Sequence, residues 1–191
     1  MTILILGLVL FLGVHSTRIL ADGWRTATIG RIGESPWKGL YSVLSIAGFA
    51  LLIWGYGLAR QQPVVLWTPP RGMNHLASLL TAVAFVLLAA AYVPGNQIKS
   101  KLHHPMVLGV KTWALAHLLA NGNLADVLLF GAFLVWAVFS FSAARRRDRA
   151  AGTVYLAGHA SRTAITVVAG LVAWAVFAVW LHAPLIGVRP V

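Results

Sequence analysis

HPMVLGVKTWALAHLLANG, from His104 to Gly122, is the stretch on which the interpretation of this chain depends. It is an apolar segment of helical length that opens with Pro105, a residue favoured at the first helical position, and stops at Gly122. A lone histidine, His117, lies well inside it. An ionisable side chain in a membrane helix costs free energy, so it usually faces the protein interior and has a partner there. The stretch therefore raises the question of what His117 binds.

The composition of the whole chain is that of an integral membrane protein. Of 191 residues, 59% are hydrophobic and only 10% are charged, whereas roughly a quarter of the residues in a soluble domain are charged. The net charge of +11 falls mostly between apolar runs, so we attribute it to membrane topology and expect no nucleic-acid partner. Because the chain has no cysteine, disulfides, iron–sulfur clusters and covalently attached haem are excluded.

Six apolar runs predict an all-α fold, a polytopic membrane helical bundle that forms a single domain over residues 1–191. The predicted transmembrane helices cover residues 2–19, 41–59, 74–93, 105–121, 124–141 and 163–182. The first run has no basic residue before it and no cleavage site after it, so we interpret it as a retained helix. Residues 21–38 are predicted to be a basic loop, and Gly122 with Asn123 predicts a tight hairpin.

The loops on the two sides of the predicted bundle differ in charge. The first, third and fifth loops hold 11 Lys and Arg residues, and the other side holds 3. Since cytoplasmic loops carry the excess of positive charge, we expect both termini to lie on the exterior or periplasmic side.

His15 is a second histidine inside an apolar helix. At 1.5 Å per residue, His15 and His117 should differ in depth by roughly 8 Å, an offset that helix tilt can absorb. Small residues flank both positions, among them Gly13 and Ala114. A cleft between two imidazoles with such surroundings suits a haem b whose iron is held by two neutral ring nitrogens. The alternative is that each ring only donates a hydrogen bond to a neighbouring helix.

Other polar residues have more than one interpretation. His75 and His182 lie near the outer surface, as interfacial anchors or as a second pair. His104 and Lys111 lie on the predicted fourth helix, where each could meet a haem propionate; His104 could instead cap the helix, and Lys111 could extend to the interface. No carboxylate pair or hydrolytic motif is present. Chemistry would therefore come largely from a bound cofactor.

Four segments carry a resemblance to a known family. They are GVHS at 13–16, YSVLSIAGFALLIWGYGLA at 41–59, AYVPGN at 91–96, and the quoted fourth helix followed by LLFGAFLVWAV. Together they resemble the bacterial NnrU family over nearly the whole chain. Its members are small multi-pass proteins of the bacterial inner (cytoplasmic) membrane, associated with denitrification and thought to be needed for nitrite and nitric oxide reduction. The family is similar to the 15-cis-zeta-carotene isomerases, which are haem b enzymes of the membrane.

The resemblance implies a pair of axial ligands. In the isomerases one axial histidine belongs to an HS motif on an early helix, which His15 matches, and the other closes a segment that runs from an HP motif to an AH pair, which His117 matches with the same spacing. His15 and His117 are thus the implied metal ligands, and His104 is implied to be a nearby functional residue. Around the cofactor we also place Lys111, Arg18 and Asn121.

Three departures limit what the resemblance implies. The isomerases have a cysteine three residues before the second ligand, where this chain has Ala114. They also have a histidine in the following helix, which aligns with Trp136 here, and an arginine before the HP motif, which is His103 here. Isomerisation by ligand exchange is therefore not implied.

We therefore weigh several functions. The first is a haem b protein with bis-histidine ligation, either an isomerase-like enzyme acting on a small apolar substrate or an electron-transfer or sensing partner of nitric oxide reductase or another redox protein. The second is a non-catalytic assembly factor for nitric oxide reductase that holds no haem. The third is a membrane methyltransferase of the isoprenylcysteine type, whose second motif and acidic pair are missing from this chain.

Overall fold

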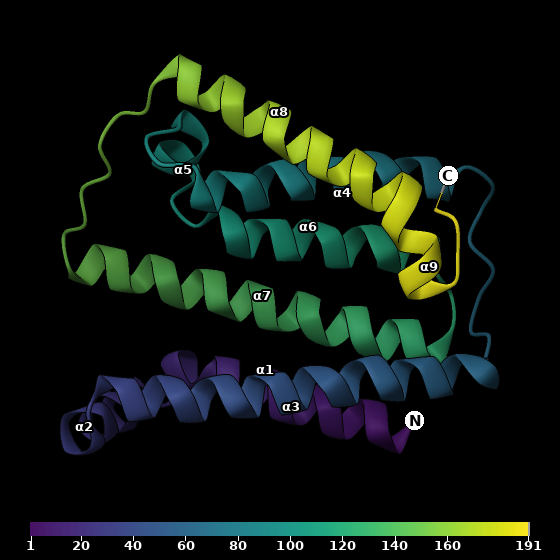
Figure 1. Cartoon of the computed structure of the whole chain (residues 1–191), viewed down its shortest axis with the longest axis horizontal. Coiled ribbons are helices and arrows are strands. Elements are labelled where there is room, and N and C mark those ends of the chain that lie inside the picture. The colour runs from purple at the N-terminus through teal and green to yellow at the C-terminus, as the bar shows by residue number, and fades with distance from the viewer. Residues whose placement is uncertain (191) are drawn as a thin grey trace.

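The apolar runs all form helices in the computed structural model, which describes residues 1–190 (Figure 1). The elements are α1 (Thr2–Leu20), α2 (Asp22–Ile32), α3 (Glu34–Gln61), α4 (Met73–Tyr92), α5 (Gln97–Leu102), α6 (Pro105–Ala120), α7 (Leu124–Ala150), α8 (Ala160–Val176), the π-helical turn η1 (Phe177–Leu181) and α9 (His182–Ile186). The prediction of an all-α membrane bundle is confirmed.

The helices differ in their capacity to cross a bilayer. Within the described residues, five helices are long and apolar enough to cross: α1, α3, α4, α7 and the continuous run from α8 to α9. The remaining apolar helix, α6, corresponds to the predicted fourth transmembrane helix and has 16 residues. Its length of about 24 Å is shorter than the bilayer hydrocarbon, which is about 30 Å thick. It packs against both α4 and α7, which places this short helix among longer ones.

One helix, α7, connects two groups of helices. The pair α1 and α3 packs along one side of α7, and α6 packs along the other, followed by α4 and then α8 (Figure 1). The N-terminus and the end of the described chain lie at the same end of the bundle (Figure 1). The six crossings expected from the sequence and the side of the membrane on which the termini lie both stay predictions.

Glycines set the distance between α1 and α3. A Cβ atom on Gly55 would lie 2.3 Å from the backbone nitrogen of Leu4, and one on Gly7 would lie 2.6 Å from the backbone nitrogen of Leu52. Only glycine permits this approach of two backbones, which is a common basis of helix association in membranes. Leu4 and Leu52 are in turn 0% and 4% exposed. The seam between α1 and α3 is therefore a tightly packed unit.

Two segments differ from the sequence prediction. Residues 21–38, expected as a loop, form α2 and the start of α3, because the turn is made by Gly33 alone, which has a φ of +86°. The neighbouring Gly30 faces open space and is tolerated within α2. The predicted fifth helix ends at residue 141, but α7 continues to Ala150, because the basic segment after it contains no proline or glycine to stop it.

The hairpin between α6 and α7 has the predicted short length. Gly122 accepts a backbone hydrogen bond from Leu66 at 2.8 Å, and Leu124 donates one to the carbonyl of Val64 at 2.8 Å. The proline-rich segment after α3 thus pairs with the hairpin, and a Cβ on Gly122 would collide with the carbonyl oxygen of Trp67. These contacts hold the C-terminal end of α3 close to the N-terminal end of α7.

We expect Gly55→Ala to destabilise the protein by about 1–3 kcal/mol, because the added methyl group would force α1 away from α3. The matched control is Gly57→Ala on the same helix, where no atom lies within 4 Å of the added carbon. Unfolding of both variants in detergent, followed by circular dichroism, measures the difference. Equal stability of the two variants would contradict the proposed close contact.

Candidate functional site

His15 lies on the face of α1 that is turned toward α7. Its ring centroid is 4.2 Å from that of Phe11, 5.3 Å from that of Tyr41 and 6.2 Å from that of Trp136. Its Nδ1–H donates a hydrogen bond of 2.7 Å to the carbonyl of Phe11. That bond fixes the ring and leaves Nε2, which has no hydrogen-bond partner among the described residues, as the nitrogen able to bind a metal.

His117 is arranged in the same way on α6. Its Nδ1–H donates to the carbonyl of Trp113 at 2.9 Å, and its ring stacks on Phe130 of α7 at 4.5 Å between centroids. Asn121 donates to the backbone carbonyl of His117 at 2.9 Å, so it supports the helix end and not the ring. Both central histidines thus have the tautomer and fixed orientation expected of metal ligands.

The two imidazoles share one aromatic layer without touching. Their partners on α7, Phe130 and Trp136, are six residues apart, which corresponds to about 9 Å of helix rise. Between them, Phe133 contacts Phe11 at 5.8 Å and Trp113 at 5.6 Å. Helices α1 and α6 do not pack directly against each other. The expected depth offset is therefore present, and the structure does not bring the two rings face to face.

Two buried polar atoms near His15 lack partners. Trp136 Nε1 and Ser45 Oγ are inaccessible to solvent and have no hydrogen-bond partner among residues 1–190. Trp136 contacts the His15 ring, and Ser45 lies one helical turn after Tyr41, which contacts the same ring. An unsatisfied buried polar group costs roughly 1–3 kcal/mol, and such groups call for an explanation by an ion or ligand. The indole N–H of Trp136, which contacts the His15 ring, is thus free to donate to a group bound there.

His104 is paired with protein groups at the other end of α7. Its Nε2 lies 2.7 Å from Oδ2 of Asp148, and the hydroxyl of Tyr155 donates to the same oxygen at 3.0 Å. The ring of His103 stacks on that of Tyr155 at 4.0 Å, and Arg145 is hydrogen-bonded to His103. Burial, and then the bond to Asp148, raise the pKa of the Tyr155 hydroxyl. This polar cluster joins the start of α6 to the end of α7.

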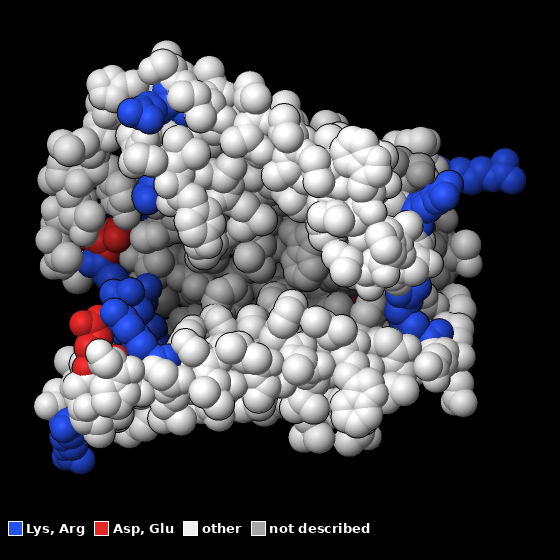
Figure 2. Space-filling model, in the orientation of Figure 1, with Lys and Arg blue, Asp and Glu red and all other residues white. Residues whose placement is uncertain are grey.

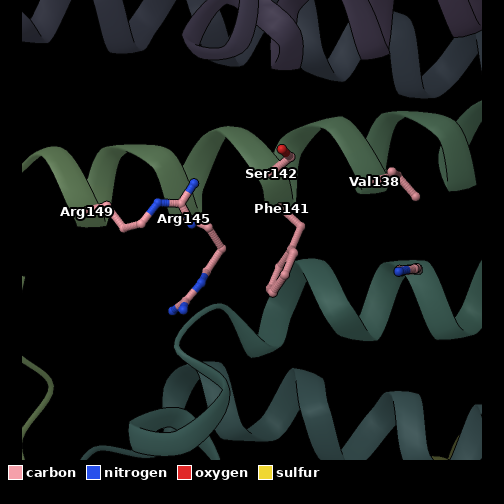
Figure 3. Close-up of a pocket in the computed structure, with 6 residues that line it drawn as sticks. Val138, Phe141, Ser142, Arg145 and Arg149 are labelled. Carbon is pink, nitrogen blue, oxygen red and sulfur yellow. The ribbon is translucent and has the colours of Figure 1, made fainter.

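Lys111 and Arg18 lie in different surroundings. Lys111 lines a recess of about 370 Å³ between α6 and α7. Figure 3 shows Phe141 and Arg145, which also line this recess. The backbone carbonyl of Arg18 accepts a hydrogen bond from Arg147 at 3.3 Å, which is on the α1 side of α7. The sequence prediction grouped Lys111 and Arg18 around one cofactor, and nothing among the described contacts joins them.

A further polar pair was not predicted. The hydroxyl of Tyr56 donates to Asp126 at 2.5 Å, and Asp126, only 3% exposed, also accepts from Asn123 in a capping box at the start of α7. The ring of Tyr56 contacts Phe130, which stacks on His117. The sequence held a signal for the cap, an Asn followed by Asp three residues later, but none for Tyr56, which is 70 residues away.

The outer histidines do not form a pair. His182 donates to the carbonyl of Val188 at 2.7 Å, and its ring lies near Phe177. His75 is exposed near the start of α4. Among the residues the structure covers, no group of three or more His, Cys, Asp or Glu side chains is placed to hold a metal ion. A metal at the site would thus depend on two protein ligands, as a haem iron does.

Comparison with known proteins gives one match. The family model described as NnrU protein matches residues 3–190. No curated protein matches the chain, and no solved structure does.

We expect Asp148→Ala to destabilise the protein, because it leaves the His104 ring, whose side chain is only 22% exposed, without its partner. Glu34→Ala removes a pair with Lys38 in which both side chains are 69% exposed, so its loss should destabilise the protein much less. Chemical unfolding of both variants in detergent compares the two. Similar losses would show that the His104 cluster contributes no more than a surface pair.

Proposed function

The chain belongs to the NnrU family of membrane proteins associated with denitrification, and from that premise we propose that it binds haem b between His15 and His117 in the bacterial inner membrane. The single observation that carries the proposal is that the two histidines inside apolar helices each donate Nδ1–H to a backbone carbonyl one turn earlier. With the proton of the neutral ring on Nδ1, Nε2 is the nitrogen that each histidine offers to a haem iron.

The surroundings of the two rings support a planar aromatic ligand. A continuous set of ring contacts leads from one histidine to the other through Phe11, Trp113, Phe130, Phe133 and Trp136. Apolar walls exclude water and lower the local dielectric, which tunes the properties of a bound haem. Trp136 Nε1 would find in a bound group the hydrogen-bond acceptor that the described residues do not supply.

The offset between the ligands determines how a haem would sit. His15 and His117 contact α7 at Trp136 and Phe130, which are about 9 Å apart along the helix, so the two imidazoles would have to approach each other to hold one iron. The side chains of Phe133 and Phe11, which now fill part of the space between the two rings, would have to move. Rotamer changes of this kind are common when ligands bind.

The role assigned to this site is electron transfer. Haem b would supply one-electron chemistry when bound, and an iron held by both His15 and His117 would have no position left for a substrate. The chain's own residues hold the imidazoles in one tautomer and exclude water. A redox partner in the reduction of nitrogen oxides, such as nitric oxide reductase, is therefore favoured over a small apolar substrate and isomerase-like turnover. We place both termini in the periplasm, because the end of the bundle away from them carries the excess of basic residues.

The test is the haem content of protein purified after haem-replete expression. We expect a haem b spectrum from the wild-type protein, and haem content reduced at least about tenfold in His15→Ala and in His117→Ala, because each removes an iron ligand. The matched controls are His75→Ala and His159→Ala, which should retain haem. Wild-type protein without haem absorbance would overturn the proposal and favour an accessory factor without cofactor.

A second test concerns the indole N–H of Trp136, which has no hydrogen-bond partner among the described residues. Trp136→Phe keeps an aromatic ring in the wall, although a smaller one, and removes the N–H, so haem should still bind while its reduction potential falls, since a hydrogen-bond donor favours the more electron-rich state. Potentiometric titration of both proteins measures the shift. An unchanged potential would show that the indole does not donate to the bound group.

A further inference from the structure

A recess between α6 and α7 combines positive charge with an apolar wall. Its lining residues are Lys111, Val138, Phe141, Ser142, Arg145 and Arg149. Four of them, Val138, Ser142, Arg145 and Arg149, follow one another at helical spacing and make a single stripe along α7. Figure 3 shows Arg145 and Phe141 extending from α7 toward α6.

This recess is separate from the proposed haem site. At 100° per residue, its stripe on α7 lies on roughly the opposite side of the helix from Trp136 and Arg147, which face α1. A ligand in the recess therefore does not need the space beside His15. Ligand binding in the recess is therefore independent of haem binding.

In the described part of the chain none of the three cations of the recess forms an ion pair, although Arg145 is hydrogen-bonded to His103. Ion pairs there involve Asp22, Glu34 and Asp148, and none of them includes Lys111, Arg145 or Arg149. Asp148 is already bound by His104 and Tyr155. The arginines near the end of α7 also complement its helix dipole, but that explanation does not extend to Lys111, which lies in the middle of α6. An anion would offset this charge.

The apolar side of the recess indicates what kind of anion fits. Val138 is 44% exposed, and the same helix exposes Val135 and Phe139 by 56% and 62%, so this part of α7 faces lipid. The space-filling view shows basic side chains gathered at the left end of the bundle, beside the hollow that lies above α7 (Figure 2). A ligand that contacts both the basic side chains and the apolar surface of α7 needs a charged head and a hydrocarbon tail.

We propose that this recess binds the phosphate of an anionic membrane phospholipid. Lys111 reaches along its aliphatic stem toward the interface, as long basic side chains do in membranes, and meets the phosphate together with Arg145 and Arg149. One acyl chain lies against Val138. The end of α7 that carries the arginines is the end we place on the cytoplasmic side, where anionic lipids attract basic segments.

The experiment uses the full-length protein, purified in detergent and stripped of lipid, and follows its thermal unfolding as lipid is added. Phosphatidylglycerol should raise the unfolding temperature at lower concentrations than phosphatidylcholine. Lys111→Gln and Arg149→Gln should each raise the half-saturating phosphatidylglycerol concentration about fivefold, since a basic residue near the membrane surface contributes about 1 kcal/mol. Lys111→Arg, which keeps the charge, should bind like the wild type.

The matched control is Arg146→Gln, because Arg146 is a neighbour on α7 that does not line the recess. Equal weakening by Arg146→Gln would overturn the proposal in favour of unspecific attraction to charge. Equal stabilisation by inorganic phosphate would overturn the lipid in favour of a soluble anion. A haem content that falls in Lys111→Gln would assign the lysine to the cofactor, whereas unchanged haem content with weakened lipid binding supports the proposal.

Discussion

The aromatic layer on α7 is the contact on which the arrangement of the bundle depends. Phe130 and Phe133 meet Trp113 of α6, while Phe133 and Trp136 meet Phe11 and His15 of α1. Helices in a membrane gain little from burying apolar surface, so such packing has to hold them together. Because α1 and α6 do not pack on one another, this layer holds the two groups in register and fixes the distance between their histidines.

Small residues serve the same purpose within each group. Gly55 admits Leu4 in the α1–α3 pair, and Gly170 of α8 lies so near α4 that a Cβ would be 2.5 Å from the Cα of Val86. Helix α6 also approaches α4 closely, since a Cβ on Gly109 would lie 3.0 Å from the backbone oxygen of Ala84.

The carboxylates on α7 show how the chain manages polarity. Asp126 caps the start of the helix and binds Tyr56, and Asp148 near its other end binds His104. Both ends of the central helix are thereby tied to neighbouring elements by satisfied polar groups, as a membrane environment requires. Within the described residues, His15, His117 and Lys111 lie inside apolar helices and form no ion pair, and a ligand is proposed above for each of them.

The sequence by itself determined the fold class, the main helices and the hairpin at Gly122, because hydrophobic runs, proline and glycine act on the local structure. It also determined the family, through motifs that cover nearly the whole chain. It also pointed to His15 and His117, since an ionisable group in an apolar helix is costly wherever the helix packs. Only the tertiary structure decided that His104 binds Asp148 and that Tyr56 binds Asp126, pairs that lie 44 and 70 residues apart. The tertiary structure also showed that Lys111 and the two histidines lie in different surroundings. The side of α7 on which α1 or α6 lies depends on helix packing, and no local sequence pattern encodes it.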